Sequence, residues 1–433
     1  MKREHHYKLK RELGLWEITL SGIGIILGAG IYALIGKAAG LAGTGVWISF
    51  LFAAMLAAFT GLSYAEFSSL FPKAGAEYIY TKRSFGNTLA FLIGWLVIFA
   101  GVIGASAVAL GFAGYFSALF ATPLIPVALL LILGLSFVVF WGIKQSALMA
   151  VVFTLIEASG LFFIISIGIP HFGSVDYFEI PSLQGLFSAA ALIFFAFIGF
   201  EEMVRLSEET KSPRKTMPHA LLIAIATTTV IYMLVALSAV SILSPQELAS
   251  SQSPVADVAS RAAGFNSFLL ISVIALFSTS NTVLLMLLAA SRITFGIASD
   301  NCLPRLLSRI HPKRKTPHYA IALVMVLSLL AALMGDIELV ANVTNFTIYI
   351  TFIVINLGVI AMRYKKPGPR PFRIPVNIGR FPIIPLLGAA TSFVMLFSLG
   401  PEIILLGLLL TLAGWAFYKT MSRRGMCSLE SGV

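Results

Sequence analysis

Residues 21–32 read SGIGIILGAGIY, and this stretch decides the fold. It lies within an apolar run, about residues 15–40, that is long enough to cross a membrane as a helix. It also holds four glycines, and each glycine weakens a helix by roughly 1 kcal/mol relative to alanine. In lipid, an interrupted helix survives only where the break is buried in protein or lines a cavity. The stretch therefore predicts a broken helix at Gly28-Ala29-Gly30, with a binding site at the break.

The composition identifies the class of protein. The chain of 433 residues is 58% hydrophobic and only 11% charged, whereas soluble proteins contain about 25% charged residues. Its apolar residues form continuous runs, not the alternating segments of about ten residues that are typical of a transmembrane β-barrel. We therefore expect an all-α polytopic membrane protein that crosses the cell membrane several times.

The apolar runs predict twelve transmembrane helices, each of which needs about 20 mostly apolar residues. The loops are too short to fold as a soluble domain, so we expect one transmembrane domain (residues 13–420) between an N-terminal tail (1–12) and a C-terminal tail (421–433). The predicted spans are about 15–40, 44–71, 87–118, 123–141, 146–169, 184–206, 218–242, 266–296, 319–334, 338–362, 382–399 and 402–419.

The basic residues predict the orientation. If the N-terminus is cytoplasmic, all of the 30 lysines and arginines except Lys37 and Arg261 fall in segments on the cytoplasmic side. Because basic residues concentrate on that side of membrane proteins, the pattern indicates that both termini are cytoplasmic. It also assigns the net charge of +11 to contact with anionic membrane lipids, and we expect no nucleic acid partner.

A second break is predicted in the sixth span. Residues 190–202 read AALIFFAFIGFEE, with Gly199 at the interruption and two acids after it. Broken helices in corresponding positions of two units indicate an inverted repeat with its site at the interface of the repeats. We therefore predict a 5+5 inverted repeat, with broken helices 1 and 6, over about residues 13–170 and 184–363. Two extra helices would follow at about 382–419.

Together the two breaks predict a site for an α-amino acid. The first N–H groups of the half-helix after Gly28 lack helical partners and carry about half a positive charge, which suits a carboxylate. The freed carbonyl groups at the second break could accept hydrogen bonds from an ammonium. The alternative is that glycines such as Gly24 and Gly28 only allow close helix packing. The predicted substrate-binding residues are Gly28, Ala29, Gly30, Ile31, Phe197, Ile198, Gly199 and Phe200.

Polar residues inside the spans are candidates for coupling and gating, because ionisable groups there are costly and usually functional. Glu157 lies in the middle of the fifth span and could carry a proton, or could be a static partner of a hydroxyl or backbone group. Glu201 follows the second break, close enough to face a cavity. Ser278 and Thr279 lie in the middle of the eighth span. Their hydroxyls could ligate Na⁺ or bond back to their own helix.

The sequence disfavours an enzyme. All six histidines lie in or beside predicted loops. The chain has no HExxH, GxSxG or P-loop pattern, which would indicate zinc, nucleophile or phosphate chemistry. We therefore expect no cofactor, no metal site and no catalytic residue.

A set of motifs resembles the amino acid–polyamine–organocation transporters, whose fold is the two-repeat LeuT type. The motifs follow one another in the order of that family and cover most of residues 12–420. They are GAGIY at 28–32, YAE at 64–66 with FPKAGAEY at 71–78 and FG at 85–86, FIGFE at 197–201 with EE at 208–209 and PRKTMP at 213–218, SR at 291–292 with SD at 299–300 and LP at 303–304, and RPFRIP at 370–375.

This resemblance implies a secondary transporter that moves amino acids, or related amines, by alternating access. It places Phe195 where some relatives have an aromatic gate, and Glu201 where antiporter relatives have a coupling acid. Proton-coupled relatives often carry a lysine in the fifth span, where this chain has Glu157. Proton symport is our first expectation, with H⁺ as the coupling ion. The alternatives are exchange, Na⁺ symport, a polyamine carrier or a non-transporting nutrient sensor.

Overall fold

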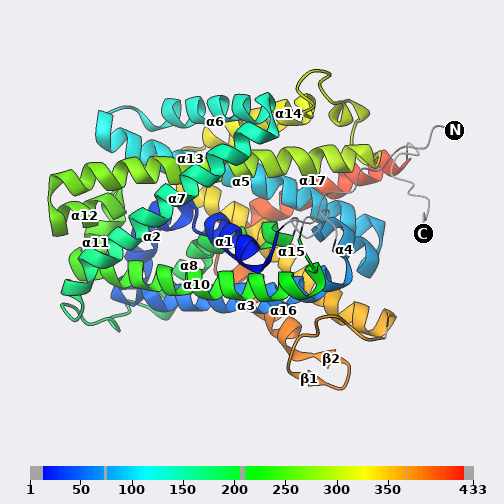
Figure 1. Cartoon of the computed structure of the whole chain (residues 1–433), viewed down its shortest axis with the longest axis horizontal. Coiled ribbons are helices and arrows are strands. Elements are labelled where there is room, and N and C mark those ends of the chain that lie inside the picture. Colours follow the sequence, from blue (N-terminus) through cyan, green and yellow to red (C-terminus); the bar gives the residue numbers. More distant parts are fainter. Residues whose placement is uncertain (1–12, 73–75, 205–209, 367, 424–433) are drawn as a thin grey trace.

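The computed structural model describes residues 13–72, 76–204, 210–366 and 368–423 (Figure 1). The predicted N-terminal tail, most of the predicted C-terminal tail and the acidic pair Glu208 and Glu209 lie outside the described residues. Helices account for nearly all of the regular structure, as expected from the apolar runs.

The first half of the chain contains seven α-helices and two short 3₁₀ helices within the described ranges. The breaks between them fall at glycine, proline or polar segments. The elements are α1 (Leu15–Ile26), α2 (Ala29–Ala42), η1 (Gly43–Gly45), α3 (Val46–Leu70), α4 (Ala76–Phe85), α5 (Asn87–Phe120), α6 (Leu124–Trp141), α7 (Ile143–Gly168) and η2 (Ile169–His171).

The second half contains further helices and one small hairpin, in which Asn377 pairs with Pro382 in antiparallel register. The elements are α8 (Leu183–Ile193), η3 (Phe194–Phe197), α9 (Phe200–Met203), α10 (Pro213–Ile242), α11 (Pro245–Ser250), α12 (Pro254–Ala263), α13 (Phe265–Ser299), η5 (Arg305–Ser308), α14 (His318–Ala332), α15 (Ile337–Lys365), β1 (Asn377–Ile378), β2 (Phe381–Pro382), α16 (Ile383–Phe397) and α17 (Pro401–Arg423).

Within the described residues, nine helical segments are long and apolar enough to cross a membrane, and the expectation of a polytopic membrane protein is confirmed. Three further apolar helices, α1, α14 and α16, are shorter. The predicted count of twelve spans and the inverted repeat stay predictions. The nine segments are Ala29–Leu70, Asn87–Phe120, Leu124–Trp141, Val152–His171, Leu183–Met203, Pro213–Ile242, Phe265–Ser299, Ile337–Lys365 and Pro401–Arg423.

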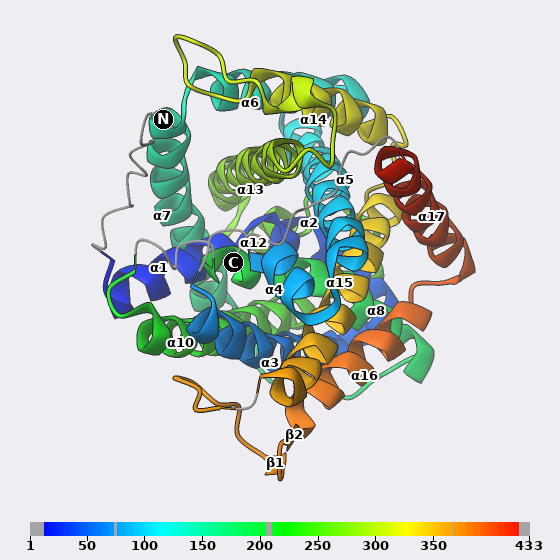
Figure 2. The same cartoon turned by 90° about the vertical axis from the view of Figure 1, so that its right-hand side faces the viewer.

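The helices form a bundle around α2, α8 and the breaks. α13 packs along α5, α3 along α10, and α2 against α8. The view along the bundle places α6, α14 and α17 at its periphery (Figure 2). Large apolar side chains such as Leu130 on α6 and Leu412 on α17 are exposed. A soluble protein rarely exposes so much contiguous apolar surface, so we assign these faces to lipid contact.

The helix expected over residues 15–40 is interrupted at Leu27–Gly28, between α1 and α2. The sixth predicted span is interrupted over a longer stretch: α8 ends at Ile193, a 3₁₀ turn follows, and Ile198 is extended. Gly199 has a φ of +129°, which side chains with a Cβ rarely adopt. This conformation lets the chain restart as α9 at Phe200.

Candidate functional site

The two interruptions lie against each other, with backbone close to backbone. A Cβ on Gly30 would lie 2.7 Å from the Cβ of Ala196, in the second interruption. A Cβ on Gly199 would lie 2.9 Å from the carbonyl oxygen of Ile25, in the last turn of α1 before the first interruption. Both glycines are therefore required for close packing, which was the alternative to a binding role. Close packing also brings the freed backbone groups of both interruptions to one place.

Tyr232 on α10 joins the two interruptions. Its fully buried hydroxyl donates its hydrogen bond toward two carbonyl oxygens, 2.5 Å from that of Ile26 and 2.9 Å from that of Ala196. One hydroxyl has one proton to donate, so the two acceptors share it. No sequence motif predicted a role for Tyr232. The only signal was a tyrosine within an apolar span, whose hydroxyl needs a partner when it is buried.

Side chains from α15 satisfy the carbonyl groups at the end of α8. The Asn345 amide donates to the carbonyl oxygens of Ala191, at 2.7 Å, and Leu192, at 3.2 Å. The Tyr349 hydroxyl donates to the Ala191 oxygen at 2.9 Å. These bonds fix the end of α8 against α15.

Side chains from α13 meet the start of α2. The Ala29 N–H donates to the hydroxyl oxygen of Thr282 at 3.0 Å, so one of the predicted carboxylate-binding N–H groups already has a partner. Thr282 donates in turn to the carbonyl oxygen of Ser278, one turn earlier, at 3.3 Å. The predicted Thr279 bonds back to its own helix, at the Ala275 carbonyl oxygen, at 2.6 Å.

Glu157 lies next to this group and is fully buried. Its Oε1 accepts a hydrogen bond from the Ser278 hydroxyl at 2.7 Å, so the structure brings together two residues that the sequence named separately. Its backbone oxygen accepts from the Tyr32 hydroxyl at 3.0 Å. Within the described ranges, Glu157 forms no ion pair. The carboxyl is thus held by neutral groups between α7, α13 and α2.

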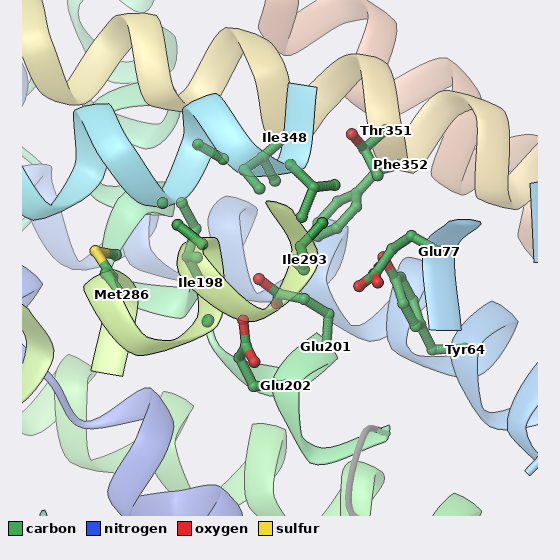
Figure 3. Close-up of a pocket in the computed structure, with 15 residues that line it drawn as sticks. Tyr64, Glu77, Ile198, Glu201, Glu202, Met286, Ile293, Ile348, Thr351 and Phe352 are labelled. Carbon is green, nitrogen blue, oxygen red and sulfur yellow. Dashed lines mark hydrogen bonds between the residues drawn. The ribbon is translucent and has the colours of Figure 1, made fainter. Parts of the chain in front are cut away.

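A cavity of about 40 Å³ lies beside the second interruption (Figure 3). Most of its lining is apolar, and the carboxyls of Glu77, Glu201 and Glu202 are its acidic part. The Glu201 carboxylate also accepts from the Gly199 N–H at 2.9 Å. The lining residues are Tyr64, Glu77, Val97, Ala100, Gly101, Ile198, Glu201, Glu202, Met286, Ala289, Ala290, Ile293, Ile348, Thr351 and Phe352.

The cavity is too small for an amino acid, since a buried water alone needs about 10–15 Å³ on this scale. Of the predicted site residues, Ile198 and Glu201 line it. Residues 28–31 are buried beside the second interruption and do not line it, and neither do Phe195, Phe197 and Phe200. This cavity therefore does not reach the first interruption. In the described part of the chain, no group of three or more His, Cys, Asp or Glu side chains is arranged to hold a metal ion.

Comparison with known proteins gives a consistent set of matches. Residues 13–412 match the family model of amino acid permeases. The chain is 32% identical to the branched-chain amino acid permease BcaP of Bacillus subtilis, over 96% of this chain and 94% of that protein. It is 32% identical to the methylthioribose transporter of the same organism, over 96% and 94%. It is 30% identical to cationic amino acid transporter 4 of Mus musculus, over 83% of this chain and 61% of that protein.

Proposed function

The chain belongs to the amino acid permease family, whose members are membrane transporters and not enzymes, and from this premise we propose that it moves amino acids across the cell membrane by alternating access. The observation that carries the proposal is the meeting of the two interruptions at Tyr232. The start of α2, with its N–H groups, and the carbonyl groups of the second interruption then lie close together, and this pair of opposite polarities would suit a zwitterion. Transport follows if helices on either side of that place open in turn.

The proposed site uses backbone groups on both sides. The N–H groups of Gly30 and Ile31, at the positive end of α2, would hold the carboxylate. Thr282 occupies the neighbouring N–H of Ala29 and fixes the direction of that end. The ammonium would compete with the Tyr232 hydroxyl for the carbonyl oxygens of Ile26 and Ala196.

We propose that transport is coupled to protons through Glu157. A carboxyl that is buried without an ion pair costs far less free energy when neutral than when charged. Gain or loss of a proton therefore changes the charge that the surrounding helices must stabilise. The alternatives among transporters are amino acid exchange and Na⁺ symport, in which Ser278 would be a ligand of the ion. A non-transporting sensor is the alternative from another class.

Uptake by the purified protein in liposomes tests the function. A thermal-shift screen of the twenty amino acids and of polyamines, with and without Na⁺ and at two pH values, first identifies the ligand, since ligands that bind the native state stabilise it. We then expect uptake of that ligand to rise when the outside is made acidic. Binding without uptake would instead assign the protein to the sensor class, and stabilisation by polyamines alone would contradict an amino acid substrate.

The variant Glu157→Gln tests the coupling. We expect it to abolish the pH dependence of uptake while ligand binding stays measurable, because the amide keeps the shape of the protonated carboxyl and cannot ionise. Ser159→Ala is the matched control, since Ser159 is on the same helix, is exposed, and bonds only the Ile156 carbonyl. An unchanged pH dependence in Glu157→Gln would exclude the proton role.

A further inference from the structure

A buried polar cluster between α7 and α13 contains two oxygen atoms without hydrogen-bond partners. The Glu157 carboxyl accepts from Ser278 through Oε1, and the Asn281 amide donates through Nδ2 to the Thr154 hydroxyl oxygen at 3.1 Å. The other oxygens, Oε2 of Glu157 and Oδ1 of Asn281, have no hydrogen-bond partner among the described residues. Glu157 and Asn281 are both buried, and an unsatisfied buried polar atom costs about 1–3 kcal/mol.

The two unpartnered oxygens belong to one polar cluster, because Thr154 and Glu157 lie three positions apart on α7. Their partners, Asn281 and Ser278, likewise lie three positions apart on α13. Two acceptors that face each other repel unless a proton lies between them. The titratable groups that interact with the carboxyl are Tyr32 on α2 and Tyr232 on α10. Among the described residues of the helices packed on α7, no lysine, arginine or histidine pairs with it.

We propose that Asn281 is an amide switch that holds Glu157 in both of its protonation states. In the first state, the protonated carboxyl would donate its O–H from Oε2 to Oδ1 of Asn281, while Nδ2 donates to Thr154 as it does in this structure. When the proton leaves to water, the amide turns over: Nδ2 donates to the carboxylate, and Oδ1 accepts from the Thr154 hydroxyl. An amide and a hydroxyl each donate and accept, so every polar atom has a partner in both states.

The switch explains how a carboxyl without an ion pair gains and loses a proton in an apolar environment. A carboxylate needs hydrogen-bond donors. Ser278 is one donor to Glu157, and the turned amide of Asn281 would be a second. A hydrogen bond to an ionised carboxylate is stronger than one between neutral groups. This added strength offsets part of the cost of burying the charge. The cluster reaches the candidate substrate site through α13, because Thr282 lies one turn after Ser278 and accepts from the Ala29 N–H.

The inference depends on the proposed function only for its role in transport, and infrared spectroscopy tests the site by itself. In difference spectra between acidic and alkaline pH, the purified wild-type protein should show the carbonyl band of a protonated carboxylic acid that Glu157→Gln lacks. In Asn281→Leu the band should move to higher frequency, because the acid O–H has lost its acceptor. It should also persist to higher pH, because the carboxylate has lost a donor.

Two further variants separate the switch from a structural role. Thr154→Ser keeps the hydroxyl and should leave the band and its pH profile as in wild type, whereas Thr154→Val should shift the profile toward that of Asn281→Leu. Ser280→Ala is the control on α13, since its hydroxyl bonds only the Leu276 carbonyl. An acid band that Glu157→Gln retains, or that Asn281→Leu leaves in place, would overturn the proposal.

The remaining outcomes are equally decisive. If wild type shows no acid band and Na⁺ raises its melting temperature but not that of Glu157→Gln, the cluster holds a cation and the proposal is wrong. If the bands behave as expected while uptake in liposomes ignores the pH gradient, the switch stands and the proton-coupled function fails.

Discussion

At the scale of single residues, the close approach of the two interruptions depends on two glycines without a Cβ and on the hydroxyl of one tyrosine. Gly30 and Gly199 bring two backbones together because neither has a Cβ. Tyr232 then joins the carbonyl groups that this approach leaves close to each other. A larger residue at either glycine would separate the interruptions and move the backbone groups that we propose as ligands.

Gly30→Ala should therefore abolish or strongly reduce uptake. The added methyl meets Ala196 in the second interruption, and forcing atoms into a packed core costs about 1–3 kcal/mol. Gly134→Ala on α6 is the control, because a Cβ there meets nothing within 4 Å and alanine favours a helix. Uptake in liposomes and the melting temperature are the measurements. Equal uptake by the two variants would show that the close approach is dispensable.

Glu247 gives a pH-dependent prediction outside the membrane-spanning segments. The Ser244 N–H and hydroxyl, with Arg261, lower the pKa of its carboxyl from 4.5 to about 2. A lowered pKa in the folded state stabilises the fold above the unfolded value, and this stabilisation is lost as the pH falls toward the folded value. Glu247→Ala should therefore lower the melting temperature by the same amount at pH 6 and pH 8.

The same comparison at lower pH checks the sign. The difference in melting temperature between wild type and Glu247→Ala should shrink as the pH falls from about 5 to 3, because the wild-type carboxyl then binds a proton and loses its bonds. A difference that stays constant over this range would mean that the carboxylate charge does not stabilise α11.

The sequence predicts part of the site at this scale and misses the rest for a physical reason. Gly28 and Gly199 are visible because glycine weakens a helix wherever it occurs. Tyr232 and Thr282 act through partners 206 and 253 positions away along the chain, and no local pattern encodes such a pairing. Ser278 was a candidate because it is a polar residue in the middle of a span. Its contact with Glu157 could not be predicted, because it depends on how α7 packs on α13.

At the scale of elements, a buried carboxylate fastens three segments at one end of the bundle. Glu66 on α3 accepts from Arg363 on α15 at 3.0 and 2.5 Å, and pairs with Arg370 at 2.9 Å. Its Oε2 also accepts from the Ile374 N–H at 3.0 Å. α3, α15 and the segment before β1 are thereby held together.

Glu66→Gln should destabilise the protein by about 3–5 kcal/mol, because removing one partner of a buried ion pair leaves uncompensated charge. Here that charge is carried by two guanidinium groups that are 3% and 7% exposed. Glu402→Gln, at an exposed position in the first turn of α17, is the control and should change little. Chemical denaturation in detergent measures both variants, and a cost for Glu66→Gln no larger than the control's would contradict this assignment.

The long helices were predictable because each carries a continuous apolar run. Such a run is visible in the sequence without knowledge of how the helices pack. The short helices α4, α11 and α12 were not predicted, since they are neither apolar throughout nor long enough to span. The second interruption is also longer than Gly199 alone indicated. Its 3₁₀ turn, Phe194–Phe197, consists of buried aromatic and alanine residues whose backbone geometry is set by the helices around them.

At the scale of the whole molecule, the arrangement of the bundle supports the alternating-access proposal. α11 and α12 lie at one end of the helices and α4 at the other (Figure 1). The interrupted helices α1, α2 and α8 lie between these ends (Figure 1). Under that proposal, the cavity of about 40 Å³ beside the second interruption would have to enlarge before a substrate enters or leaves.

The proposed orientation and span count give the last prediction, which depends on α14. This helix has 15 residues, or about 22 Å at 1.5 Å per residue, whereas the hydrocarbon core is about 30 Å thick. If α14 crosses the membrane with its flanking residues, five spans separate Glu179 from Arg380, and these exposed residues lie on opposite sides. If it does not cross, four spans separate them and they lie on the same side.

Single-cysteine variants distinguish the two cases. In a background with Cys302→Ser and Cys427→Ser, Glu179→Cys should react with a membrane-impermeant maleimide added to intact cells. Arg380→Cys should react only after the membrane is opened, because basic segments stay in the cytoplasm. Labelling of both from outside, or of neither, would remove α14 from the spans and with it the five-span second repeat. Labelling of Arg380→Cys alone would keep the repeat and invert the whole molecule.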